Sequence, residues 1–182
     1  GNLDKLKTAV HFGADAVYFS GKKFGLRAFA GNFDENEIFE AMDYLHSHNK
    51  KGYITLNIVA KDDDFDGLDD YLDLLVKAKV DGLIVSDVGL IYYIRKNFPS
   101  LNIHVSTQAN VNNSQSAKFF ADLGCTRIVL ARELSLEDIK KMHAQLGDKV
   151  ELEAFVHGAM CISYSGRCLL SNYLSGRDSN RG

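Results

Sequence analysis

The strongest constraint on the fold is a regular alternation of helix-like and strand-like segments along the chain. Strand patterns occur at 14–20, 52–60, 82–86, 102–109, 127–131 and 150–156, each preceded by a helical pattern. Three strand entries also resemble one another: GADAVYF, VDGLIVS and GCTRIVL. Repeated βα units of this kind are typical of an α/β fold built around a parallel sheet.

The helical segments carry recognisable start and stop signals. Asn2, Asn113 and Ser135 are expected N-caps, and Asp34 begins the capping box Asp34-x-x-Glu37. The predicted helices run from these caps to Gly13, Leu45, Gly124 and Gly147, with two more at 68–79 and 88–97.

The polarity of alternate strand positions separates the two common parallel architectures. A doubly wound sheet has helices on both faces, whereas a barrel can direct polar side chains into its lumen. One parity of three predicted strands is polar: Thr55 and Asn57, then His104, Ser106 and Gln108, then Glu151, Glu153 and His157. This pattern favours an incomplete (β/α)8 TIM-like barrel with about six of the eight units.

The expected organisation is a truncated barrel at 1–157 followed by a cysteine-containing segment at 158–182. Because the chain starts with a helix, we expect one strand to precede it and another to follow Gly182.

Charge and hydropathy exclude several classes of protein. The net charge of −3 over 182 residues argues against a polyelectrolyte binder, so no DNA partner is expected and any RNA contact requires a local patch. There is no apolar run long enough to span a bilayer and no signal-peptide pattern, which predicts a cytoplasmic protein without a membrane partner. The 3 cysteines do not suggest a disulfide framework.

In either architecture the functional groups gather where the strands end. We therefore take Asn57, Gln108, Glu153 and His157 as the catalytic candidates. For other strand-end residues a structural role competes well. The role of Asp87 could be limited to capping the next helix, and Arg132 with Glu133 could form a solvated ion pair.

The loop after the first strand combines basic and aromatic residues. RNA recognition uses cations for phosphate and rings for stacking on unpaired bases. The phenylalanines could equally pack beneath the loop. The residues in question are Lys22, Lys23 and Arg27, with Phe24, Phe29 and Phe33.

Two cysteines distinguish the segment after the last strand. Cys161 and Cys168 are seven residues apart, close to Gly158 and Gly166, which permit tight turns. Thiolates at this spacing can bind a metal or an iron–sulfur cluster, but such sites need four ligands. The spacing alone is therefore a weak signal for a metal, and buried or free thiols are the alternative. Cys125, at the start of a strand, is expected in the core.

The same segment resembles the signature of the peptidase U32 family, and the opening Gly1–Leu3 is also similar to that family. The signature is Glu-x-Phe-x-x-Gly-[Ser/Ala]-aliphatic-Cys-x4-Gly-x-Cys-x-aliphatic-Ser. Its fixed positions are occupied by Glu153, Phe155, Gly158, Ala159, Met160, Cys161, Gly166, Cys168, Leu170 and Ser171.

The resemblance implies several activities. Some members of the family are described as collagenase-like proteases, and others resemble enzymes that hydroxylate a tRNA wobble uridine with prephenate, or a ribosomal RNA cytidine. It also implies that Cys161 and Cys168 are two of four ligands of a [4Fe–4S] cluster, with the other two cysteines beyond this chain.

The residues themselves help to choose among these activities. The sequence has neither His-Glu-x-x-His nor Gly-x-Ser-x-Gly, so no peptidase mechanism can be written from it. We therefore expect tRNA hydroxylation, with tRNA and prephenate as partners and with Lys22, Lys23, Arg27 and Arg167 contacting RNA or substrate. A peptidase acting on a peptide is the alternative, and a non-catalytic binding partner is the third. The chain by itself is expected to be inactive and not to retain the cluster.

Overall fold

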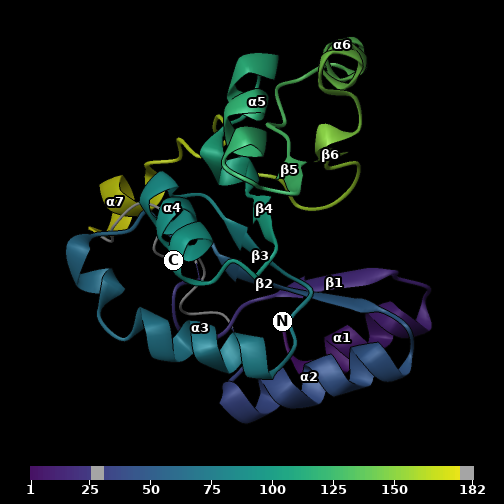
Figure 1. Ribbon diagram of the computed structural model, residues 1–182, viewed down its shortest axis with the longest axis vertical. Helices are drawn as coiled ribbons and strands as arrows, with labels where there is room; N and C mark the ends of the chain where they lie inside the picture. Colours follow the sequence, from purple (N-terminus) through teal and green to yellow (C-terminus); the bar gives the residue numbers. More distant parts are fainter. Residues whose placement is uncertain (26–30, 177–182) are drawn as a thin grey trace.

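The computed structural model describes residues 1–25 and 31–176. Six parallel strands lie side by side in chain order, so each strand pairs with the next one in the sequence. The sheet curls into a half-barrel with helices on its outer side (Figure 1). The strands are β1 (Ala16–Phe19), β2 (Lys51–Leu56), β3 (Gly82–Val85), β4 (Ile103–Val105), β5 (Arg127–Val129) and β6 (Glu151–Glu153). The expected α/β half-barrel is confirmed.

Helices connect successive strands, as the sequence predicted. Five do so: α2 (Glu35–Ser47), α3 (Leu68–Lys77), α4 (Val88–Asn97), α5 (Ser114–Asp122) and α6 (Leu136–Leu146), while α1 (Leu3–His11) precedes β1. Short 3₁₀ turns occur at η1 (Asp62–Phe65), η2 (Thr107–Ala109) and η3 (Gly147–Lys149). A further helix, α7 (Leu170–Ser175), lies in the cysteine-containing segment that follows the sheet.

The helix starts follow the predicted capping chemistry. The Asp34 carboxylate accepts a hydrogen bond from the Glu37 backbone N–H at 2.9 Å, and Glu37 accepts one from the Asp34 N–H at 2.8 Å. Asp87 accepts from the Leu90 N–H at 3.0 Å, so its structural role as a cap is confirmed. Each cap satisfies backbone donors that the first helical turn leaves without a partner.

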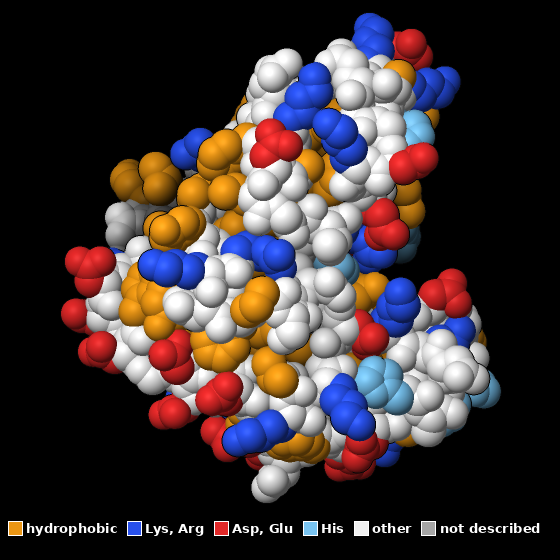
Figure 2. Space-filling model, viewed as in Figure 1, with side chains coloured by type: hydrophobic (Ala, Val, Ile, Leu, Met, Phe, Trp, Pro, Cys, Tyr) orange, Lys and Arg blue, Asp and Glu red, His pale blue; other side chains and the backbone are white. Residues whose placement is uncertain are grey.

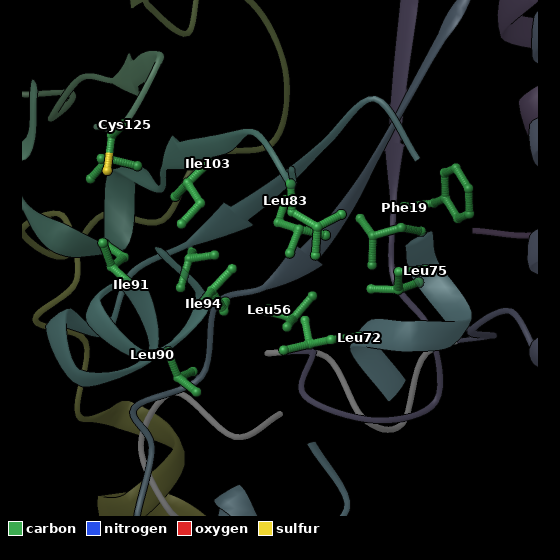
Figure 3. Packing of buried hydrophobic residues seen from close by; sticks show 14 of the residues in the cluster. Phe19, Leu56, Leu72, Leu75, Leu83, Leu90, Ile91, Ile94, Ile103 and Cys125 are labelled. Carbon is green, nitrogen blue, oxygen red and sulfur yellow. The ribbon is translucent and has the colours of Figure 1, made fainter. Parts of the chain in front are cut away.

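The hydrophobic core lies between the outer face of the sheet and the helices. Figure 3 shows Leu56 beside Leu72, and Ile94 near Ile103. Cys125 belongs to this core, as expected, and is 2% exposed. Because the outward parity of the strands supplies these apolar contacts, the opposite parity faces the lumen of the half-barrel.

Several predicted strands are longer than the observed ones. Residues 107–109, which were expected at the end of a strand, form η2 instead. The Ser106 hydroxyl accepts a hydrogen bond from the Gln108 N–H at 3.2 Å, and Asn110 ends the turn in the left-handed region. This local side-chain bond competes with the sheet ladder, so β4 stops at Val105.

Candidate functional site

A cavity of about 230 Å³ lies in the lumen, toward the carboxyl ends of the strands. It is formed by residues from all six strands or the turns that follow them. In (β/α) barrels this end of the sheet carries the active site. The lining residues are Gly1, Tyr18, Phe19, Ser20, Asn32, Thr55, Asn57, Ile84, Ser106, Thr107, Gln108, Val129, Glu153 and Phe155.

Three of the four catalytic candidates meet in this cavity. Asn57 follows β2, Gln108 lies in η2 and Glu153 ends β6, and all three contribute to the lining. His157 does not line it and is exposed to solvent. The strand ends thus bring together an acid and two amides, whereas His157 lies outside the lumen.

The carboxylate of Glu153 is held by an ion pair with Arg127, which lies deeper in the lumen beside Glu151. The Arg127 guanidinium lies 3.3 Å from a Glu153 carboxylate oxygen and 2.5 Å from one of Glu151. Its cationic carbon also stands 5.3 Å from the centre of the Tyr53 ring. Hydrogen bonds from Arg127 lower the pKa of Glu151. Arg127 therefore ties two neighbouring carboxylates of β6 to β5.

His104 lies in the same layer and is buried, as expected of a core histidine. Its ring packs edge-on against Tyr53, with 4.5 Å between ring centres. Burial, together with the charge of Arg127, lowers its pKa to about 4. The Nδ1 atom has no hydrogen-bond partner among the residues that the structure describes. His104 is therefore neutral near pH 7.

The segment after β6 is anchored to the end of β5 by Arg132 and Glu133. The Arg132 guanidinium donates hydrogen bonds to the carbonyl oxygens of Cys161 and Ser163, the latter at 2.6 Å. The Glu133 carboxylate accepts from the Ser165 N–H at 2.9 Å. The alternative of a solvated ion pair is therefore wrong, because both side chains bind the segment 161–168, here called the cysteine loop.

Gly166 packs this loop against the cavity wall. It has a φ of +72°, and a Cβ at this position would lie 2.0 Å from the Gln108 carbonyl oxygen. Only glycine permits this conformation and approach without strain. The cysteine loop and the cavity therefore share a backbone contact.

The thiols of Cys161 and Cys168 are neighbours. Hydrogen bonds from the Leu170 backbone N–H, the Ser163 side chain and the Cys161 thiol lower the pKa of Cys168. Neither cysteine forms a disulfide. Within residues 1–25 and 31–176, no group of three or more His, Cys, Asp or Glu side chains could hold a metal. The described residues thus supply two adjacent thiols, whereas a four-thiolate site needs four.

The predicted basic surface is mixed in charge. The Lys22 ammonium lies 3.5 Å from Asp34, and Lys22 and Lys23 share a hollow with Asp63, Asp64 and Asp66. Figure 2 shows acidic side chains gathered over the region of η1 and α3. Arg27 lies outside the described residues, and Arg167 is exposed.

Two of the aromatic residues near this loop pack inward. Phe24 contacts the Tyr71 ring, with 5.3 Å between centres, and Phe33 is buried against Phe19. For these two the packing alternative is right. Phe29 lies outside the described residues.

Sequence reasoning missed part of the cavity wall. Tyr18 and Phe155 lie on the inward parity of the first and last strand segments, the same signal that identified Glu153. The contacts of Arg132 and Glu133 span about 30 residues, and no local pattern predicts them.

In the described part of the chain, no helix is long and apolar enough to cross a membrane.

Comparison with known proteins finds relatives that are named as tRNA hydroxylation proteins and relatives that are named as proteases. Residues 1–182 match the model of Peptidase family U32. "tRNA hydroxylation protein P1" of Bacillus subtilis is 47% identical over the whole chain, which covers 43% of that protein. "Uncharacterized protease MJ0090" of Methanocaldococcus jannaschii is 45% identical, again over the whole chain and 44% of that protein.

A solved structure confirms the fold. The U32 peptidase Mk0906 matches with a TM-score of 0.71 at 22% identity, covering 87% of this chain and 66% of that one. The chain spans less than half the length of the two curated relatives described above. The motif at Glu153–Ser171, the half-barrel and the match over every residue agree, and the chain belongs to peptidase family U32.

Proposed function

We propose that the protein containing this chain modifies RNA, and that its reaction is the prephenate-dependent hydroxylation of a wobble uridine in tRNA. The observation that carries the proposal is the cavity that joins Asn57, Gln108 and Glu153, with Gln108 packed against Gly166 of the segment that holds two neighbouring thiols. The name of the Bacillus subtilis relative supports the coarser part of this proposal, hydroxylation of tRNA. Because the proposed substrate is tRNA, we expect the protein in the cytoplasm.

The proposed roles in the cavity follow from the chemistry of each side chain. Glu153 can accept a proton or a hydrogen bond from the substrate, and Arg127 fixes the position of its carboxylate. The amides of Asn57 and Gln108 can each donate and accept hydrogen bonds, which suits orientation of a substrate. His157 lies outside the cavity, so a role for it requires contact with a part of the substrate that stays outside.

We further propose that Cys161 and Cys168 are two of four ligands of a [4Fe–4S] cluster in the full-length protein. Such a cluster supplies electron transfer when it is bound. The chain's own contribution is to present both sulfur atoms together. Arg132 holds the backbone around Cys161, and the hydrogen bonds that lower the Cys168 pKa favour the thiolate that a metal requires.

Contacts with the tRNA backbone are proposed for the exposed cations Lys23 and Arg167, and for Lys22 and Arg27 of the same loop. Lys22 must exchange its ion pair with Asp34 for a phosphate. Because acidic side chains of η1 border this loop, we expect its contribution to tRNA affinity to be modest.

The peptidase alternative finds less support in the site. Proteolysis by serine or cysteine needs a nucleophile beside a base. Among the described residues, the serine–histidine hydrogen bond that is present joins Ser47 and His48 at 3.0 Å on the surface, outside the cavity. Ser165, which lies near the site, is buried and bonded to Arg132 and Glu133 instead.

The proposal is tested with the full-length protein, purified without oxygen. We expect iron and sulfide in the wild type, their loss in Cys161→Ser and Cys168→Ser, and their retention in Cys125→Ala, a control thiol in the core. The wild type should restore hydroxylated wobble uridine, measured by mass spectrometry of tRNA, in a strain lacking that modification. A metal-free protein that cleaves gelatin and restores no modification would support the peptidase instead.

A further inference from the structure

We propose that the lumen cavity receives the base of the target nucleotide, turned out of the RNA, rather than its phosphate or the anionic co-substrate. This inference rests on the proposed function and identifies which part of the substrate the site binds. It follows from the charge, shape and aromatic content of the cavity wall.

The wall offers neutral hydrogen-bonding groups in place of cations. The described side chains that line it include the amides of Asn57 and Gln108 and the hydroxyls of Ser20, Thr55 and Thr107, but no lysine, arginine or histidine. Glu153 adds a carboxylate. A phosphate or a dicarboxylate would find no side-chain cation among the described lining residues, and Arg127 behind Glu153 is already paired with Glu153 and Glu151. A uracil ring is uncharged, and its alternating carbonyl and N–H groups match amides and a carboxylate.

Two aromatic side chains stand at opposite edges of the curled sheet and line the same cavity. Tyr18 comes from β1 and is 60% exposed, and Phe155 follows β6 and is 40% exposed. Rings that remain this exposed inside a lumen are available for contact with a ligand. Stacking of a base on an aromatic side chain is the usual way in which proteins hold an unpaired base.

The volume of the cavity fits a single ring better than a nucleotide. At about 230 Å³ it is smaller than the roughly 300–1,000 Å³ of pockets that enclose drug-sized ligands. Enzymes that act on a base commonly turn it out of its stack into a pocket of this kind. The sugar and phosphates would then remain outside the cavity.

A photochemical crosslink tests the inference without relying on turnover. The full-length protein is irradiated with an anticodon stem-loop carrying one 4-thiouridine at the wobble position, and the crosslinked peptide is mapped by mass spectrometry. We expect attachment to lining residues, Tyr18 or Phe155 in particular, and no displacement by prephenate. Attachment outside the lining, no crosslink at all, or displacement by prephenate would overturn the inference.

Substitutions provide a second readout. Tyr18→Leu should weaken binding of the stem-loop by roughly 5- to 150-fold, the range expected for one lost stacking contact. Tyr18→Phe should retain most of the affinity. Tyr92→Leu is a matched control, because Tyr92 is also 60% exposed but lies on α4, outside the cavity. Equal effects of the two leucine substitutions would contradict the inference.

The two proposals fail separately. If the wild type restores hydroxylated uridine in cells but the crosslink maps elsewhere, the base-binding role is wrong and the proposed function stands. If the protein restores no modification yet still crosslinks through its cavity, the base-binding role stands and the reaction is wrong.

Discussion

Substitution of Gly166 by alanine should loosen the cysteine loop, and its cost can be worked out from the structure. A left-handed φ of +72° costs a residue with a side chain about 1–2 kcal/mol. The added methyl would also lie 2.0 Å from the Gln108 carbonyl oxygen, and relieving an overlap with backbone typically costs about 1–3 kcal/mol. We therefore expect a loss of about 2–5 kcal/mol, concentrated where the loop meets η2.

Gly67→Ala separates the two contributions. Gly67 has the same φ of +72°, but nothing lies within 4 Å of its would-be Cβ. Urea unfolding of both variants should show a loss of about 1–2 kcal/mol for Gly67→Ala. If the Gly166 contact opens locally rather than unfolding the whole protein, Cys161 and Cys168 should react faster with a thiol reagent in Gly166→Ala only. Indistinguishable stability and thiol reactivity in the two variants would refute the contact with Gln108.

Three further predictions concern the charged groups. Because the pKa of His104 is lowered to about 4, the unfolded chain binds more protons between about pH 6.5 and 4, so stability falls as the pH drops through that range; His104→Phe should flatten this slope in urea titrations. Arg132→Lys should speed alkylation of the two signature thiols several-fold, whereas Arg95→Lys, which also removes contacts to backbone carbonyls, should not; equal rates would contradict the anchoring role. Arg127→Met removes the cation that pairs with Glu151 and Glu153 and should destabilise the protein by about 1 kcal/mol at pH 7, with a smaller loss at a pH low enough to protonate Glu151, whose pKa Arg127 lowers; a loss that is unchanged with pH would contradict the ion pair.

The parts of the fold that local chemistry decides were predictable from the sequence. Caps such as Asp34 and Asp87 act within three residues, so the pattern alone identifies them. The alternation of polar and apolar residues likewise predicted the inward parity that brings Asn57 and Glu153 together. The end of β4 was missed because a single hydroxyl, that of Ser106, captures a backbone N–H that the sheet would otherwise use.

The contacts that shape the site could not be predicted from the sequence, for a different reason. Arg132 binds carbonyl oxygens about 30 residues away. Because every residue has a backbone carbonyl, the sequence does not indicate which ones a side chain will bind. The position of His157 depends on where the chain leaves the lumen, which strand periodicity does not specify. The proximity of the Cys161 and Cys168 thiols similarly depends on the turn between them.

The strand order has a consequence for how this molecule assembles. Since each strand pairs with its neighbour in the sequence, most of the sheet can form by successive addition of units, over short chain separations that favour rapid folding. The cavity is different, because Tyr18 of β1 and Phe155, which follows β6, both line it. Its wall is complete only after every intervening unit is in place, so we expect ligand binding to be the last property to appear during refolding.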